Sequence, residues 1–82
     1  MNIEPLIPMA NRIGEFFETM RNREQGMQEI AHHIRSFWDP RMRSALLSFI
    51  ELHPDGQGPE GCLSPIVLEA VQSHAAQLQP KT

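Results

Sequence analysis

Apolar residues recur every three or four positions along most of this 82-residue chain, which is the period of an α-helix. This pattern predicts four helices, at residues 8–20, 23–38, 40–52 and 65–78. A loop rich in glycine and proline is expected at 53–63, and the tail at 79–82 is expected to fray. We find no alternating pattern typical of a strand. Residues 1–82 should therefore form a single all-α domain of three to four short helices.

Two residues are suited to begin helices. Asn22 precedes the second predicted helix, and its side chain can accept a hydrogen bond from a free backbone N–H of the first turn. Asp39 can do the same for the third helix, where Pro40 occupies a first-turn position that needs no N–H partner. The residue before a proline avoids the α-helical conformation. We therefore predict a sharp helix–helix corner at Asp39-Pro40, with almost no loop.

Size and charge exclude several classes of protein. A chain this short buries only about 60% of the surface that its unfolded form exposes, so its core is thin. Ten acidic residues outnumber seven basic ones, which disfavours binding to nucleic acid or to an anionic membrane surface. No apolar stretch approaches the roughly 20 residues that span a bilayer, and no signal peptide is visible. We expect a cytoplasmic protein completed by a protein partner.

The residues that could carry chemistry do not form a recognisable site. His32 and His33 are adjacent, so on a helix they point about 100° apart and do not share a metal ion in the usual way. Cys62 is the only cysteine and has no Cys-x-x-Cys partner. Gly56, Gly58 and Gly61 spell Gly-x-Gly-x-x-Gly, but no strand precedes them as a dinucleotide site requires. We predict no catalytic, cofactor-binding or metal-binding residue in this chain.

The corner at Asp39-Pro40 is the densest group of residues typical of protein interfaces. It combines the only tryptophan with arginine and methionine, types that are enriched at the energetic centres of interfaces. We expect Phe37 in the core and Trp38 shared between core and interface, with an arginine near the indole. The predicted partner-binding residues are Arg35, Trp38, Arg41, Met42 and Arg43.

Two segments carry a resemblance to a known family. The sequence MANRIGEFF at Met9–Phe17, followed by HIRSFWDPRMR at His33–Arg43, resembles the formate dehydrogenase delta subunit family. The resemblance covers about half of the chain, to Leu47. These proteins are small accessory chains of soluble, molybdenum-dependent, NAD-linked bacterial formate dehydrogenases.

The resemblance implies a non-catalytic subunit that supports the assembly, stability or activity of such a complex. The larger subunits would carry molybdopterin, iron–sulfur clusters and flavin, and the molybdopterin-containing catalytic subunit would be the main partner. Two alternatives remain open. One is a transient maturation factor whose arginines meet the phosphates of the molybdenum cofactor during its insertion. The other is a small DNA-binding regulator built around the helix corner, which the acidic net charge disfavours.

Overall fold

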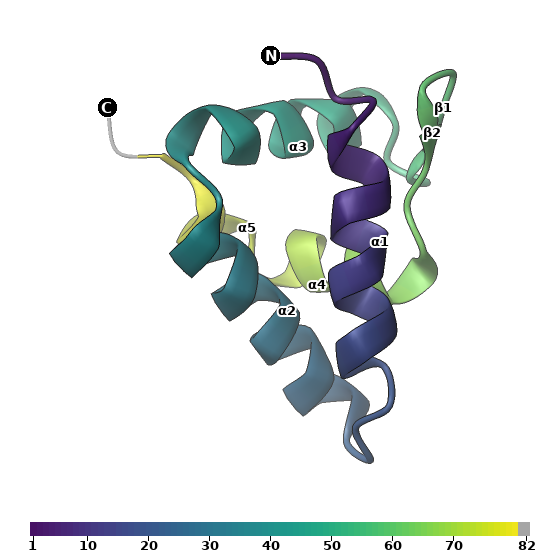
Figure 1. The fold of residues 1–82 in the computed structure, drawn as a ribbon, viewed down its shortest axis with the longest axis vertical. Helices are drawn as coiled ribbons and strands as arrows, with labels where there is room; N and C mark the ends of the chain where they lie inside the picture. The colour runs from purple at the N-terminus through teal and green to yellow at the C-terminus, as the bar shows by residue number, and fades with distance from the viewer. Residues whose placement is uncertain (81–82) are drawn as a thin grey trace.

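The computed structural model describes residues 1–80 and contains five helices and one short antiparallel ladder. In chain order they are α1 (Leu6–Phe17), α2 (Arg23–Phe37), α3 (Pro40–Leu52), β1 (Gln57–Gly58), β2 (Gly61–Cys62), α4 (Pro65–Ser73) and α5 (Ala75–Leu78). Figure 1 shows α1, α2 and α3 as three sides of a triangle, with α4 and α5 behind it. The prediction of a small all-α domain is confirmed, with the ladder as an exception.

The two predicted caps begin α2 and α3. The Asn22 side chain accepts a hydrogen bond from the backbone N–H of Gln25 (3.2 Å). The carboxylate of Asp39 accepts one from the backbone N–H of Met42 (2.9 Å), and Pro40 is the first residue of α3. Both caps occupy extended backbone conformations, so the chain changes direction at each of them. The predicted corner at Asp39-Pro40 is therefore present.

Helix α1 is shifted toward the N-terminus relative to the predicted range 8–20. The backbone N–H of Ile7 donates to the carbonyl of Ile3 (3.2 Å), so a helical turn already exists before Pro8. Proline is tolerated there because first-turn N–H groups have no partner within the helix. At the other end the Thr19 hydroxyl donates to the carbonyl of Phe16 (2.9 Å). This bond satisfies a free terminal carbonyl, and the chain then turns toward α2.

The last predicted helix, 65–78, is divided in two. Helix α4 ends at Ser73, and His74 leaves the helical conformation before the four-residue α5 begins. The change of direction buries Leu78 completely against the rest of the domain. The predicted frayed tail lies partly outside the described residues, which end at residue 80.

The predicted loop at 53–63 contains the ladder, which the sequence pattern did not reveal. Gln57 pairs with Cys62, and Gly58 pairs with Gly61. Gly56 has a positive φ of 76°, a conformation that side chains with a Cβ rarely adopt. A Cβ on Gly58 would lie 2.6 Å from the ring of Phe49, so glycine lets the ladder pack closely on α3. The Gly-x-Gly-x-x-Gly pattern therefore has a structural explanation.

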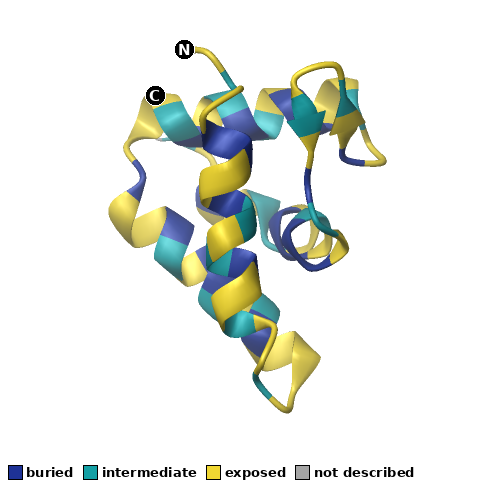
Figure 2. Ribbon diagram, turned by 45° about the vertical axis from the view of Figure 1, so that its right-hand side comes forward, coloured by how far each residue is buried: buried dark blue, intermediate teal, exposed yellow. Residues whose placement is uncertain are grey.

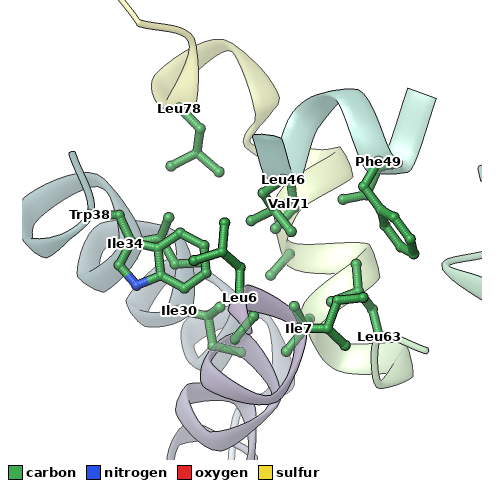
Figure 3. Close-up of a cluster of buried hydrophobic side chains, with 14 of the residues drawn as sticks. Leu6, Ile7, Ile30, Ile34, Trp38, Leu46, Phe49, Leu63, Val71 and Leu78 are labelled. Carbon is green, nitrogen blue, oxygen red and sulfur yellow. The ribbon is translucent and has the colours of Figure 1, made fainter. Parts of the chain in front are cut away.

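One apolar cluster joins all five helices (Figure 3). Its members are Leu6, Ile7, Ala10, Ile30, Ile34, Trp38, Leu46, Phe49, Ile50, Leu63, Ile66, Val67, Ala70, Val71 and Leu78. Figure 2 shows the helices buried on the sides that face this cluster and exposed on the sides that face away. Each fully buried Leu, Ile, Val or Phe side chain contributes about 1.5–3 kcal/mol, which offsets the conformational entropy lost by a short chain.

Two glycines allow helices to approach closely. A Cβ on Gly14 of α1 would lie 2.5 Å from the Cγ2 atom of Val67 in α4. A Cβ on Gly26 of α2 would lie 2.8 Å from the backbone carbonyl oxygen of Phe17. These distances are shorter than ordinary van der Waals contacts. Glycine at both positions therefore sets how tightly α1 packs on α2 and α4.

The start of α4 has the same sequence pattern as that of α3, with Ser64-Pro65 in place of Asp39-Pro40, but its hydrogen bonds differ. Pro65 is the first helical residue, but the Ser64 side chain makes no capping hydrogen bond. Instead the backbone N–H of Ser64 donates to the Asn11 side-chain oxygen (2.8 Å), and the Asn11 amide donates to the Cys62 carbonyl (2.9 Å). A residue of α1 therefore fixes the approach to α4.

Candidate docking surfaces

The predicted partner-binding residues divide into buried and exposed groups. Trp38 is only 5% exposed, and its indole lies in the core beside Ile34 and Leu6 (Figure 3). Arg43 is 7% exposed, whereas Arg35 on α2 and Arg41 on α3 are exposed, and Met42 is partly buried. Within residues 1–80 no arginine makes a cation–π contact with the Trp38 ring, although Arg12 lines the same groove as Trp38. The corner therefore offers two exposed arginines, and its tryptophan belongs to the core.

Arg43 stabilises the packing of α3 on α5. One terminal guanidinium nitrogen, Nη1, donates a long hydrogen bond of 3.5 Å to the carbonyl oxygen of Leu78 at the end of α5. The Nε atom is buried and has no hydrogen-bond partner within the described part of the chain. A cation near the carbonyl end of a helix is placed favourably. Burial leaves Arg43 little surface to offer to a partner protein.

Arg41 lines a groove along α3. The groove has a volume of about 600 Å³ and lies between α3 and the N-terminal segment that contains Met1, Asn2 and Ile3. The residues of α3 that line it include the small residues Ser44, Ala45 and Ser48, and Leu52, His53 and Glu60 line it as well. Among the residues from 1 to 80 that line it, Arg41 is the only arginine or lysine. This groove is the first of two surfaces to which a protein partner could bind.

A second surface was missed by the sequence analysis. Four rings follow one another from α1 to α2, and we call Phe16, Phe17, His33 and Phe37 the aromatic row. The ring centroids of Phe16 and Phe17 are 4.9 Å apart, those of Phe17 and His33 are 6.2 Å apart, and those of His33 and Phe37 are 4.7 Å apart. Phe16 is 70% exposed and Phe37 is 74% exposed. The row therefore presents aromatic surface to solvent.

The prediction that Phe37 is a core residue is wrong. Phe37 is the last residue of α2, and the corner then places its neighbour Trp38 in the core instead. On a helix, residues four positions apart share a face, which explains why His33 and Phe37 lie ring to ring. The four-residue spacing of His33 and Phe37 is the feature of the sequence that could have indicated this surface.

A shallow groove between α1 and α2 borders the aromatic row. It has a volume of about 320 Å³ and is lined by Met9, Arg12, Ile13, His33 and Trp38. None of these lining residues is acidic. Arg12 is exposed, and the salt bridge recorded for residues 1–80 joins a different arginine, Arg23, to Glu69. This α1–α2 groove is therefore apolar with a positive rim, on a chain whose net charge is −3.

The candidate reactive residues remain scattered. Within residues 1–80 no three His, Cys, Asp or Glu side chains lie close enough together to hold a metal ion. Cys62 is exposed in β2, and one cysteine does not supply the four thiolates of a typical iron–sulfur cluster. His32 is exposed, and His33 belongs to the aromatic row. None of the described helices is long and apolar enough to cross a membrane.

A comparison with protein families gives the context for these surfaces. Residues 5–71 match the model of the NADH-dependent formate dehydrogenase delta subunit, FdsD. The chain belongs to this family. The match confirms the resemblance carried by Met9–Phe17 and His33–Arg43 and extends beyond Leu47 through the ladder into α4. Searches of curated proteins and of solved structures each found no match. The matched region includes the whole aromatic row and the corner.

Proposed function

We propose that this delta-family chain is a non-catalytic accessory subunit that binds the larger subunits of an NAD-dependent molybdenum formate dehydrogenase. It supports the assembly, stability or activity of that complex in the cytoplasm. The larger subunits carry molybdopterin, iron–sulfur clusters and flavin, and the molybdopterin-containing subunit is the chief partner. The observation that carries this proposal is the family match over residues 5–71.

The shape of the domain supports a docking role. A thin helical domain exposes two surfaces that a partner could cover, the groove along α3 and the aromatic row. In our proposal Arg35 and Arg41 contact acidic groups of the partner, and Met42 adds apolar contact. The buried Trp38 and Arg43 hold the corner in shape. In this proposal all five predicted residues serve binding, three by contact with the partner and two by holding those three in place.

Burial of Arg43 favours a stable subunit over a maturation factor. The maturation alternative places a cluster of arginines on the phosphates of the molybdenum cofactor, and each contact needs an accessible guanidinium. Of the three arginines near the corner, Arg43 is the one that the fold covers. We therefore place the accessory subunit first.

Affinity purification of the tagged chain from its native cell tests the proposal. We expect a large molybdenum-containing partner in near-equal amount, together with formate-dependent reduction of NAD. The same partner in trace amounts, poor in cofactor and inactive, would point to maturation instead. Recovery of no formate dehydrogenase subunit would overturn both roles.

A charge reversal tests the corner itself. The variant Arg41→Glu should recover at least tenfold less partner, because it places a negative charge where we propose acidic partner groups. Arg21→Glu is the matched control, since Arg21 is also exposed but lies before α2, at the opposite end of that helix from the corner. Circular dichroism should show both variants fully helical. Equal recovery with both variants would contradict a contact at Arg41.

A further inference from the structure

The aromatic row leaves two of its four rings largely exposed to solvent. Phe16 and Phe37 stand at its two ends, with exposed fractions of 70% and 74%. Phe17 and His33 are only partly buried between them, and Met9 borders the row from the adjoining groove. Contiguous apolar surface rimmed by polar residues is typical of interaction sites. The row also ends at Phe37, two residues before the corner at Asp39.

The charge beside the row indicates the chemistry of its occupant. Arg12 and His33 line the α1–α2 groove, together with Met9, Ile13 and Trp38. Glu15 lines a neighbouring groove with Arg12, yet no ion pair between them is recorded in the described part of the chain. A carboxylate brought beside Arg12 would gain a charge-assisted hydrogen bond. An apolar side chain would fit between the two helices.

The exposed area is too small for a second copy of this chain. A phenylalanine side chain provides about 200 Å² of surface, so the exposed parts of Phe16, Phe37 and Met9 amount to roughly 400 Å². Two rows packed face to face would bury about 800 Å², below the roughly 1,200 Å² at which specific, stable interfaces begin. A second copy would also bring the same groove lining, which contains no acidic residue, to face Arg12, so a different partner that supplies a carboxylate fits this surface better.

We propose that the aromatic row and the α1–α2 groove bind an amphipathic segment of the larger formate dehydrogenase subunit. That segment places an apolar side chain in the groove and a carboxylate beside Arg12, and its apolar face covers Phe16 and Phe37. This inference rests on the proposed function and adds the surface through which it operates.

The first experiment removes the exposed rings. The tagged double variant Phe16→Ala/Phe37→Ala is compared with wild type, with Leu52→Ala and with Arg21→Ala in the native cell. Leu52→Ala probes the α3 groove, where Leu52 is 76% exposed, and Arg21→Ala is the control, since Arg21 is exposed and lines neither groove. We expect at least tenfold less co-purified formate dehydrogenase subunit with the double variant and wild-type recovery with the control. The single variant Phe37→Ala provides the same comparison if the double variant fails to fold.

The outcomes separate failure of this inference from failure of the proposed function. If wild type recovers no formate dehydrogenase subunit, the proposed function fails and this inference fails with it. If wild type recovers the subunit and the row variant recovers it equally, only the aromatic row is excluded. If Leu52→Ala loses the subunit while the row variant keeps it, the α3 groove is the docking face. A concentration-dependent dimer of the isolated chain that the row variant abolishes would replace the partner segment by a second copy.

The second experiment tests the proposed carboxylate. Arg12→Glu should reduce recovery of the subunit at least tenfold, whereas Arg12→Lys, which keeps the charge, should retain most of it. Raising the salt concentration during washing should lower recovery of the wild-type complex by a larger factor than recovery of the Arg12→Gln complex, because salt screens a charge that the glutamine lacks. Unchanged recovery with Arg12→Glu would exclude an acidic group at this position.

Discussion

The two proline corners of this domain, Asp39-Pro40 and Ser64-Pro65, begin helices α3 and α4 with the same sequence device. At the first corner the exposed Asp39 carboxylate accepts the backbone N–H of Met42 in its own helix. At the second corner the Ser64 hydroxyl is buried without a partner, and the backbone N–H of Ser64 is bound by Asn11 of α1. The backbone N–H at the first corner is therefore bound by a side chain of the same turn, and the backbone N–H at the second corner by a side chain of a distant helix.

The difference follows from what covers each corner. A Cβ on Gly14 would lie 3.3 Å from the Ser64 hydroxyl oxygen, so α1 packs directly over the second corner. The serine side chain is held in that contact, and its local capping bond is absent. A helix start at the surface can therefore follow local rules. A helix start beneath another helix depends on which side chain that helix supplies.

At both corners a large apolar residue is buried just before the cap, Trp38 at the first and Leu63 at the second. The largest expected effect comes from removing such a side chain. Trp38→Ala should lower the free energy of unfolding by about 3–5 kcal/mol through lost burial and the cavity that remains. Its neighbour Phe37 is the matched control, and Phe37→Ala should change stability by no more than about 0.5 kcal/mol. Urea unfolding followed by circular dichroism measures both variants. Similar losses for the two aromatic residues would contradict the orientation of this corner.

The next effect removes the distant partner of the second corner. Asn11→Ala deletes two hydrogen bonds, leaves the Ser64 N–H and the Cys62 carbonyl without protein partners, and should cost about 1–3 kcal/mol. Asn11→Asp keeps the acceptor for Ser64 and loses the donor to Cys62, so it should cost less. Thermal unfolding of the two variants ranks them. A neutral Asn11→Ala would mean that water replaces both bonds.

The local cap of the first corner has a smaller expected contribution. Asp39→Ala should cost about 0.5–2 kcal/mol, because the backbone N–H of Met42 then depends on water. Asp39→Ser retains a capping oxygen and should recover most of that loss. Denaturant midpoints of the two variants provide the comparison. Equal midpoints for alanine and serine would show that the cap contributes little.

The smallest effect belongs to the serine that does not cap. Ser64→Ala removes a buried hydroxyl that has no partner, so stability should stay within about 0.5 kcal/mol of wild type or rise. Asp39→Ala is expected to be destabilising, so the difference in stability between the two alanine variants tests whether only the first corner is capped by its own side chain. A loss above about 1 kcal/mol at Ser64 would indicate a capping bond that forms in solution.

Sequence reasoning succeeded where the physical cause lies within a few residues. Asn22, Asp39 and Pro40 begin helices because of bonds to the next turn, and these starts were predicted correctly. The ladder at Gln57–Cys62 was missed because it has only two residues in each strand, too few for an alternating pattern. The role of Asn11 was missed because its partners are more than fifty positions away.

The residues proposed for docking show the same limit. The sequence identified the corner but not which of its side chains face solvent. A helical period gives the relative directions of Phe37 and Trp38, yet the packing of α3 and α5 decides which one becomes buried. Arg43 was expected at the surface, and α5 covers it because the chain bends at His74. Nothing in the residues near Arg43 indicates that bend.

The contact between Asn11 and Ser64 also bears on the order in which the domain folds. It closes a loop of more than fifty residues, whereas α1 and α2 are joined by a short turn and can pair early. We expect the Asn11 bonds to form after the rate-limiting step of folding. Bonds absent from the transition state slow unfolding and leave the folding rate unchanged. A single amide side chain would thus lengthen the lifetime of the folded domain without helping it to form.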